Sequence, residues 1–525
     1  MREGRSVGVA SLLRAEQKAR DFGQLILVSN RGPLEHKVLE GGRLTTRRGQ
    51  GGLVTALEPL AGRSGALWIA AASSEGDRIA VETAGSREIP VTLPDGRCWL
   101  ELVNLPKPVY HQHYNVFSNP LLWFLQHRLW GLLDRPNLEE CLLRAWRDGY
   151  VPANRAFAEA VVAAAHDRPL PTIMLHDYHL YLAPGYIRAQ LPRAIIHHFV
   201  HIPWPTPAAW QILPSAMSQA ICAGLVASDV VGFQTHRHAR NFLRSCRSFL
   251  KGARVDEEKG TVTWWEGHTA HVRVYPISVD VPGLRRLADS FEVQAYRKFL
   301  ATRCAGQAAI VRVDRLDPSK NVVAGFRAYD LLLRRQPELA GRVRFLAFLV
   351  PSRTRIPEYQ RYQQEVMRTV NEINARHGRD GWLPIDLFYE DNRLQALAGL
   401  QLYDVLLVNS VADGMNLVAK EGPVVNRREG VLVLSEEAGA HDQLAGGALS
   451  IAPTDVEATA EALSRALSMT SSERQRRGEV LRAQVEEQDL DHWVNSQLED
   501  LHQLAAGHSQ ALKLANDWLV PRRKE

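Results

Sequence analysis

Residues 404–421 read DVLLVNSVADGMNLVAKE, an apolar stretch followed by a short polar loop and a segment with helical spacing. The apolar residues predict a buried strand, and Asp413 with Gly414 predicts the turn that follows it. We expect Met415–Lys420 to open a helix. A strand, a glycine turn and a helix in this order are typical of a parallel sheet covered by helices.

The same pattern recurs along the chain. Short apolar stretches rich in β-branched residues end in small or polar residues, and segments such as Asn154–Ala165 and Val322–Arg335 have helical spacing. This alternation predicts an α/β protein with two doubly wound, Rossmann-like parallel-sheet domains facing across a cleft. The expected strands are Leu25–Asn30, Ala66–Ser73, Thr172–Tyr178, Ala194–Pro203, Ala308–Arg315, Val343–Val350, Ile385–Glu390, Asp404–Ser410 and Gly430–Gly439.

Composition limits the class of protein. The chain has 525 residues, 45% apolar and 23% charged, so it can bury more than one core and is not disordered. Its formal net charge of +5 is small for this length, which argues against a dedicated nucleic-acid binder. The sequence contains no bilayer-spanning apolar run and no secretory leader, so we expect a cytoplasmic protein without a membrane partner. Five scattered cysteines without a CxxC pair favour reduced thiols over a disulfide framework or a zinc site.

Changes of pattern divide the chain into four parts. We expect an N-terminal arm over residues 1–22 and a first sheet domain over residues 23–276. The boundary follows VYPISVD, where a strand-like run precedes a proline and a polar helical stretch. The second sheet domain is expected over residues 277–490. Residues 491–525 predict a C-terminal helix, which closes the second domain or packs back on the first, and a frayed tail.

Two cations follow the strand that begins the second domain, in the segment VDRLDPSKN. An Asp-Pro turn separates Arg315 from Lys320 and brings both side chains to one side. Two cations match a diphosphate, which gains charge as the bond to it breaks. An exposed, salt-bridged loop is the structural alternative. Its position directly after a strand, in the same half as ADGMN, favours the diphosphate site.

The segment after DVLLVNS suits the same type of ligand. Asp413 can accept hydrogen bonds from sugar hydroxyls, and Glu421, about two turns into the expected helix, can reach a ribose diol. The N–H groups at the start of that helix suit an anion. A helix that simply uses an aspartate as its N-cap is an equally weighted alternative for this segment.

Strand ends in the first half also carry polar residues. Arg31 follows LILVS and is a candidate phosphate ligand, while the glycines of RRGQGGL, including Gly52, allow close approach of a ligand to the backbone. Asp177 in LHDYHL and His201 in HHFVHIPWPTP are expected to hold hydroxyl groups. The HHxxH spacing does not suit a metal on a strand, because His198 and His201 alternate faces, so we expect no metal site.

An aromatic segment and the missing motifs complete the pattern. YNVFSNPLLW ends in Trp123 and begins with Tyr114, which would shape a sugar pocket or pack in the core. The sequence contains no GxxxxGK[ST], no GxSxG and no Cys/His nucleophile arrangement, which argues against kinases and hydrolases. The remaining pattern describes a transferase that acts between a phosphorylated acceptor and a nucleotide donor.

The chain resembles the trehalose-6-phosphate synthases over roughly residues 24–505. Nine segments occur in the family's order: LILVSNRGP, RGQGGL, YNVFSNPLLW, LHDYHL, HHFVHIPWPTP, VVGFQT, VDRLDPSKN, ADGMNLVAKE and GVLVLSEEAGA. Those enzymes are retaining GT-B glycosyltransferases of family 20. They transfer glucose from a nucleotide-glucose to glucose 6-phosphate, which gives trehalose 6-phosphate and a nucleoside diphosphate. The resemblance therefore implies this fold, this activity and no metal or other cofactor.

The resemblance also implies a role for each matching residue. The acceptor phosphate would be held by Arg31, Tyr114, Trp123 and Arg353, and the acceptor sugar by Asp177. The implied donor ligands are His201 and Asp413 with the backbone of Gly414, Met415, Asn416 and Leu417 for glucose, Arg315 and Lys320 for the diphosphate with Gly52 nearby, and Glu421 for ribose. The implied catalytic residues are Asp177, His201, Arg315, Lys320 and Asp413.

Three departures keep alternatives open. The family's RLDYSKG is RLDPSKN here, its LRDGMN is VADGMN, and KEGPVVNRR replaces an aromatic residue and alanines. DPSKN and PVVN lean toward cyclitol-coupling pseudo-glycosyltransferases of the same fold. The trehalose-type pattern is kept at Tyr114, Ser118, Asn119, Trp123, Met415 and Lys420. Glucosylglycerol-phosphate synthesis is a further alternative. A non-catalytic sugar-phosphate sensor is a lesser alternative, because such relatives lose the diphosphate cations or donor carboxylates that this chain keeps. UDP-glucose is the expected donor, with GDP- and ADP-glucose as alternatives, and the family includes homo-oligomers.

Overall fold

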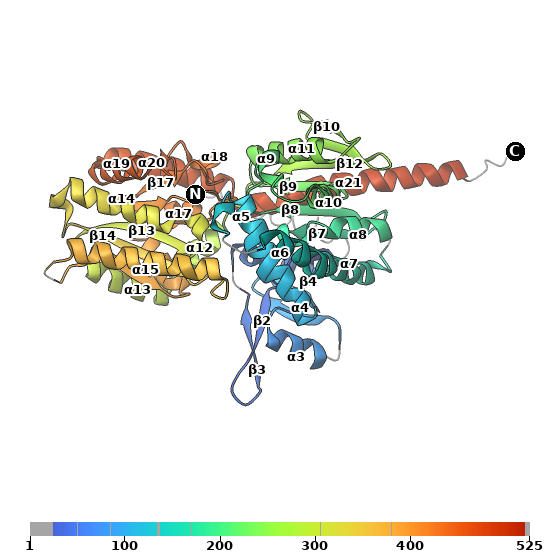
Figure 1. Cartoon of the computed structure of the whole chain (residues 1–525), viewed down its shortest axis with the longest axis horizontal. Coiled ribbons are helices and arrows are strands. Elements are labelled where there is room, and N and C mark those ends of the chain that lie inside the picture. Colours follow the sequence, from blue (N-terminus) through green and yellow to red (C-terminus); the bar gives the residue numbers. More distant parts are fainter. Residues whose placement is uncertain are drawn as a thin grey trace, which may run out of the picture. The chain divides into compact units, whose positions relative to one another are not determined.

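The computed structural model describes residues 25–49, 51–83, 86–133, 137–168, 170–304, 306–379 and 381–519, with side chains as far as Gly507. The predicted N-terminal arm and the tail from residue 520 lie outside this range. The described residues form two compact units (Figure 1). Unit 1 holds the described residues up to Leu122, those of 137–275, and the last helix from Asp491. Unit 2 holds residues 123–133 and the described residues of 276–490.

Unit 2 is built on a six-stranded sheet in which every pairing is parallel. The spatial order β15-β14-β13-β16-β17-β18 places the first strand of the unit beside the fourth, which is the order of a dinucleotide-binding Rossmann sheet. The strands are β13 (Ala308–Arg315), β14 (Val343–Val350), β15 (Ile385–Tyr389), β16 (Val405–Val408), β17 (Val431–Ser435) and β18 (Leu449–Ile451).

One apolar core joins this sheet to three of its helices. Phe326 and Tyr329 of α14 are fully buried against Phe345 of β14, and the Phe326 and Phe345 rings meet edge to face at 5.2 Å. Phe345 is opposite Ile310 in the parallel register, so the core sits under the centre of the sheet. The three helices are α14 (Val322–Arg335), α15 (Pro357–His377) and α19 (Val456–Ser468).

The remaining helices of unit 2 include those that border the sheet ends. The first, Trp123–Gln126 (α5), comes from residues far earlier in the chain than the rest of the unit. The others are α12 (Val281–Ala288), α13 (Phe291–Cys304), α16 (Arg393–Leu400), α17 (Val418–Val425), α18 (His441–Leu444) and α20 (Ser471–Glu487).

Unit 1 contains a ten-stranded sheet of order β10-β11-β12-β9-β8-β7-β1-β4-β6-β5. The strands from β12 to β6 in this order are parallel, and antiparallel strands close both edges. The parallel strands are β1 (Ile26–Val28), β4 (Leu67–Ala71), β6 (Gly96–Val103), β7 (Thr172–His176), β8 (Ile195–Val200), β9 (Val230–Phe233) and β12 (His268–Val274). The edge strands are β5 (Ile89–Leu93), β10 (Arg254–Asp256) and β11 (Thr261–Trp264), and β2 (Leu34–Val38) pairs with β3 (Leu44–Arg48) in a separate hairpin.

Apolar helices bury the centre of this sheet. Phe157 and Val161 of α7 pack with Ile26 of β1 and Ile69 of β4 in a core in which all four are fully buried. The main helices and helical turns are α2 (Gly52–Ser64), α3 (Glu75–Thr83), α4 (Lys107–Tyr110), η1 (His111–Leu122), α6 (Leu138–Ala145), α7 (Val151–Ala165), α8 (Ala183–Gln190), α10 (Ser215–Val226), α11 (His236–Phe249) and α21 (Leu490–Leu519).

The last helix, α21, is fixed to unit 1 by polar and aromatic contacts. Asp491 pairs with Arg63 of α2 at 2.8 Å, and the hydroxyl of Tyr275 donates to Asp500. The Trp493 ring meets Phe199 of β8 edge to face at 5.4 Å. The helix therefore packs on the unit formed by the first half of the chain.

The structure confirms all nine strands expected from sequence and the α/β class. One local prediction is wrong: the helix expected to open at Met415 begins at Val418, which places Glu421 in its first turn rather than two turns in. Asn416 has φ 77°, a left-handed conformation that cannot belong to a right-handed helix. No helix in the described part of the chain is both long and apolar enough to cross a membrane. All five cysteines are free.

The core of unit 2 gives a matched test of packing. Replacing the fully buried Phe326 by alanine should lower the free energy of unfolding of this unit by about 3–5 kcal/mol, because it leaves a cavity beneath the sheet. Phe291→Ala is the control, since Phe291 is 85% exposed, and its effect should stay within about 0.5 kcal/mol. Urea unfolding followed by intrinsic fluorescence measures both; equal effects would contradict the assigned core.

Candidate active site

In each unit the strand order reverses once, between β13 and β16 in unit 2 and between β1 and β7 in unit 1. Connections leave toward opposite sides there, so a crevice opens beyond the carboxyl ends of the two strands. Arg315 ends β13 and Asp413 follows β16, while Arg31 follows β1 and Asp177 directly follows β7. The fold therefore places these predicted residues at the switch point of their own unit.

Lys320 and Asp413 form an ion pair at the unit 2 switch point. Lys320 ends the short turn Pro318–Lys320 after β13, and both side chains are more than four-fifths buried. Ser410 Oγ and Asn416 Nδ2 also donate to Asp413 Oδ2, at 3.2 and 3.1 Å. Burial raises the pKa of Asp413, but the Lys320 ammonium, with a smaller contribution from the Asn416 amide, outweighs it and holds the pKa below its ordinary value. The carboxylate is therefore charged and fixed in position.

The backbone after Asp413 forms a set of open donors. The N–H groups of Gly414, Met415, Asn416 and Leu417 donate no hydrogen bond to any acceptor in the described residues. Carbonyl oxygens fix the position of this segment. Ala440 N donates to Met415 O at 2.8 Å, and Gly439 N donates to Asp413 O at 3.1 Å. Successive free N–H groups in a turn make an anion-binding concavity.

Close packing maintains this turn. A Cβ at Gly439 would clash with the carbonyl oxygen of Gly414, so only glycine allows the two loops to approach this closely. Asn416 Oδ1 accepts from Ala419 N at 3.2 Å and so caps the start of α17. The left-handed Asn416 thus ends the turn just before α17, which begins at Val418.

A buried arginine supports the turn that carries Lys320. Arg312 of β13 has no exposed surface, and its guanidinium pairs with Asp314 at 2.8 Å. The same group donates to the carbonyl oxygens of Lys320 at 2.9 Å and Val322 at 3.3 Å. Arg312 therefore fixes the backbone that carries Lys320. Sequence reasoning missed it, although a charged residue inside an apolar strand is a visible signal.

A second polar cluster in unit 2 surrounds Asp317, which is fully buried. Its carboxylate accepts from Arg353 at 2.8 Å, from the Tyr359 hydroxyl at 2.9 Å and from Trp123 Nε1 at 3.2 Å. Burial raises the pKa of Asp317, but the guanidinium groups of Arg353 and Arg315 lower it well below its ordinary value. Asp317 is thus a charged anchor that sequence reasoning treated only as part of a turn.

Two cations lie near the Trp123 ring. The guanidinium carbons of Arg353 and Arg315 lie 4.0 and 5.3 Å from its ring centroid, within cation–π range. The structure therefore brings together Trp123, Arg353 and Arg315 in unit 2. Only the first two were expected to share a ligand, since Arg315 was assigned to the diphosphate.

A pocket of about 130 Å³ opens beyond β13, β14 and β15, with Glu421 at its border. The Phe348 and Phe388 rings in its wall are stacked, with centroids 4.9 Å apart. Burial raises the pKa of Glu421, against a smaller lowering by Arg393. The adjacent Lys420 points elsewhere and donates to Ile277 O at 2.7 Å. Other lining residues are Val313, Val350, Glu390, Asp391, Asn392, Gln395, Ala396, Leu397 and Leu400.

At the unit 1 switch point, Arg31 and Tyr114 are in contact. Arg31 Nη2 donates to the Tyr114 hydroxyl at 3.2 Å. The Tyr114 ring is stacked between Tyr110, at 5.5 Å and 4°, and His179, at 5.6 Å and 10°. These two aromatic neighbours fix the orientation of Tyr114 and were not predicted, although His179 lies within LHDYHL and Tyr110 shortly before YNVFSNPLLW.

Asp177 and His201 lie at the ends of the adjacent strands β7 and β8. Asp177 has φ 75°, and its carbonyl oxygen accepts from His198 Nε2 at 3.2 Å. His201 Nε2 and His176 Nδ1 share a hydrogen bond of 3.2 Å. Burial lowers the pKa of His201 to about 3 and that of His176 well below its ordinary value, so both rings are neutral. The described residues contain no group of His, Cys, Asp or Glu arranged to hold a metal ion.

Gly52 begins helix α2 in unit 1, directly after Gly51, which has φ 121°. The nearby Gly49 makes a close backbone approach of its own, because its N–H donates to Pro33 O at 2.7 Å. A Cβ at Gly49 would clash with the carbonyl oxygen of Gly32. In the RRGQGGL segment, Gly49 is therefore needed for a close backbone contact within the chain itself.

The chain is similar to known proteins over most of its length. The model of the family described as Glycosyltransferase family 20 matches residues 23–503. An alpha,alpha-trehalose-phosphate synthase (UDP-forming) from Dictyostelium discoideum is 32% identical over 477 residues, which cover 90% of this chain. The chain spans 61% of that relative's length and 52% of the length of a second curated relative, from Thermoproteus tenax.

Solved structures match over most of both chains. A trehalose-6-phosphate synthase structure from E. coli bound with UDP-2-fluoro glucose has a TM-score of 0.78 and 29% identity, and covers 92% of this chain and 99% of its own. A UDP-forming trehalose-phosphate synthase from Burkholderia xenovorans in complex with glucose-6-phosphate has a TM-score of 0.78 and 29% identity, with coverage of 91% and 100%. These likenesses confirm the expected GT-B fold. The chain belongs to glycosyltransferase family 20.

Proposed function

We propose that the chain transfers glucose from UDP-glucose to glucose 6-phosphate, with retention at the anomeric carbon, to give trehalose 6-phosphate and UDP. The observation that carries this proposal is the donor side of unit 2, where Lys320 lies beside the open N–H groups of Gly414–Leu417. The names of the relatives above support the choice of UDP and of glucose 6-phosphate.

The unit 2 switch point offers hydrogen-bond donors for a diphosphate and carboxylates for sugar hydroxyl groups. The diphosphate would accept from the four backbone N–H groups and from Lys320 and Arg315. Glu421 would bind the ribose hydroxyls at the border of the pocket beyond β13. Asp413 and His201 are the residues proposed to accept from hydroxyls of the donor glucose. Gly52, in unit 1, would allow close approach of the diphosphate.

Binding the diphosphate requires Lys320 to change its partner. In the present structure its ammonium is neutralised by Asp413. A diphosphate offers more negative charge than one carboxylate, so Lys320 would move to it and leave Asp413 to accept from sugar hydroxyls. Arg312 holds the turn in place during this exchange, since it binds backbone carbonyl groups rather than the ligand.

On the acceptor side, Arg31 and Tyr114 would bind the phosphate of glucose 6-phosphate, and Asp177 its sugar hydroxyls. Arg353 and Trp123 complete the proposed set of phosphate ligands, with Asp317 and Tyr359 as the groups that orient Arg353. The acceptor hydroxyl would attack from the face that the diphosphate leaves, and a diphosphate oxygen would take its proton. Lys320, Arg315 and the backbone N–H groups would stabilise the charge that develops on the leaving group, without a metal cofactor.

A donor-by-acceptor matrix tests the proposed activity. UDP-, GDP- and ADP-glucose are each combined with glucose 6-phosphate, glycerol 3-phosphate and a cyclitol 7-phosphate, and nucleoside diphosphate release is measured. We expect the highest kcat/KM for UDP-glucose with glucose 6-phosphate. A higher value for another acceptor would replace the proposed substrate, and no release in any combination would favour a sensor.

Lys320→Ala should lower kcat by about 100-fold or more, because it removes one donor from the leaving diphosphate. Lys298→Ala, at an exposed lysine of α13 in the same unit, is the matched control and should leave kcat within about twofold. UDP release at saturating substrates measures both variants. An unchanged kcat in Lys320→Ala would remove Lys320 from the reaction.

Arg31→Ala should raise the KM for glucose 6-phosphate by about tenfold or more, since a charge-assisted hydrogen bond to phosphate is lost. Tyr114→Phe keeps the stacked ring and removes only the hydroxyl, so its effect should be smaller. Turnover with unphosphorylated glucose serves as the reference. If Arg31→Ala weakened the use of glucose as much as that of glucose 6-phosphate, Arg31 would not be a phosphate ligand.

A further inference from the structure

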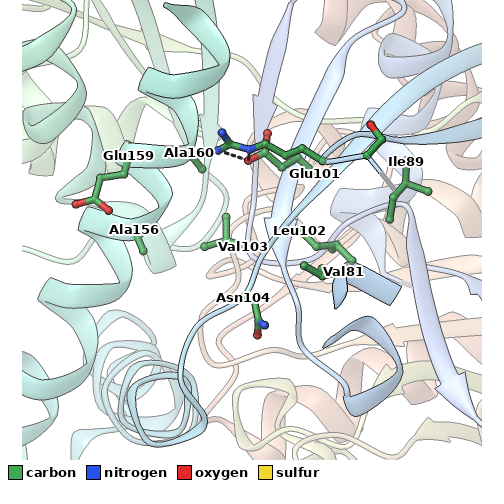
Figure 2. Close-up of a pocket in the computed structure, with 11 residues that line it drawn as sticks. Val81, Ile89, Glu101, Leu102, Val103, Asn104, Ala156, Glu159 and Ala160 are labelled. Atoms are coloured by element: carbon green, nitrogen blue, oxygen red, sulfur yellow. Dashed lines mark hydrogen bonds and ion pairs between the residues drawn. The ribbon is translucent and has the colours of Figure 1, made fainter. Parts of the chain in front are cut away.

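Unit 1 contains a cavity of about 370 Å³ beyond the carboxyl end of β6 (Figure 2). It is open to solvent on one side and is lined by the end of α3, the start of β5, the end of β6 and one side of α7. β4 separates β6 from β1 in the sheet, and none of the residues assigned to the acceptor or donor lines the cavity. The cavity is therefore a separate feature of this unit.

A buried carboxylate is the main polar group of the cavity. The side chain of Glu101 in β6 is 5% exposed, and its Oε1 accepts from Arg87 Nε at 2.6 Å. Its other oxygen, Oε2, has no hydrogen-bond partner in the described part of the chain. Burial raises the pKa of Glu101, against the lowering by Arg87. A bound hydroxyl that donates to Oε2 would satisfy this oxygen.

The other lining groups offer both donors and acceptors beside apolar surface. Ser86, Asn104 and Glu159 are exposed polar residues at the rim, and the Arg87 side chain is 55% exposed. The apolar lining residues are Val81, Ile89, Leu102, Val103, Ala156 and Ala160. Figure 2 shows the Glu101 side chain between the α7 residues and Ile89.

We propose that this cavity binds a neutral polyhydroxylated molecule of mono- or disaccharide size. Hydroxyl groups donate to carboxylates and accept from guanidinium and amide groups, which matches the mixed polar lining. Arg87 balances the charge of the buried Glu101, and the second carboxylate of the lining, Glu159, is exposed at the rim, so the buried part of the lining favours a neutral ligand. The C–H faces of such a molecule would pack on the valine and alanine side chains.

Helix α7 links the cavity to the loop that carries Asp177. Ala156, Glu159 and Ala160 line the cavity, and Asn154 on the same helix accepts from Leu182 N and Ala183 N at 3.0 and 3.1 Å. Asn154 Nδ2 also donates to His179 O at 3.0 Å. A ligand in the cavity would therefore contact the same helix that fixes the Asp177 loop.

Saturation-transfer NMR on the full chain tests the proposal. The probes are sucrose and myo-inositol as neutral polyols and agmatine as a cation, each up to about 10 mM, in the presence of excess UDP and glucose 6-phosphate. We expect a polyol to bind with a Kd in the millimolar range or below and agmatine not to bind. Binding of agmatine alone, or of no probe, would overturn the proposal.

Three variants test whether the probe binds in this cavity. Ala156→Trp fills the cavity and should abolish polyol binding, and Glu101→Gln should weaken it by about tenfold while keeping the side-chain shape. Glu82→Gln, an exposed glutamate of α3 outside the lining, is the matched control and should bind normally. Polyol binding that survives both Ala156→Trp and Glu101→Gln would overturn the proposal. The readout is binding, so the result does not depend on the proposed transfer reaction.

Discussion

The reversal of strand order in each parallel sheet is the constraint on which the rest of the structure depends. In unit 2 it separates the loops after β13 and β16, and in unit 1 those after β1 and β7. Loops that diverge leave backbone N–H groups and strand-end side chains without covering structure above them. The chain uses the same topological position twice, with Lys320 and Asp413 in one unit and Arg31 and Asp177 in the other.

Carboxylates hold the cations of these loops in place. Asp317 orients Arg353, Asp413 pairs with Lys320, and Asp314 pairs with the fully buried Arg312. Leaving any of these partners buried and unpaired would cost several kcal/mol, so the arrangement is fixed before a ligand arrives. These cations have different roles in the proposed function, because Arg312 binds backbone carbonyl groups while Lys320 would exchange Asp413 for a phosphate. Preorganised charge of this type is what stabilises a leaving diphosphate.

Sequence reasoning found the buried parallel strands because continuous apolar runs such as Val343–Val350 have few other uses. It did not identify β10 and β11 near a sheet edge, where Val262 is buried but the other residues of the two strands are exposed or partly buried. The start of α17 was misplaced because nothing in the composition of ADGMN reveals that Asn416 is left-handed. The cluster around Asp317 was missed for another reason: Trp123 and Asp317 are 194 residues apart in sequence and meet only in the folded unit.

Hydrogen exchange of the backbone after Asp413 tests the central claim most directly, because that claim concerns N–H groups that no side-chain substitution can remove. Exchange is followed by mass spectrometry on the full chain, with and without UDP. Peptides that contain residues 414–417 and the turn at Lys320 should exchange more slowly when UDP is bound, while the β2–β3 hairpin should not change. Saturating UDP that leaves exchange at residues 414–417 unaltered would contradict the account.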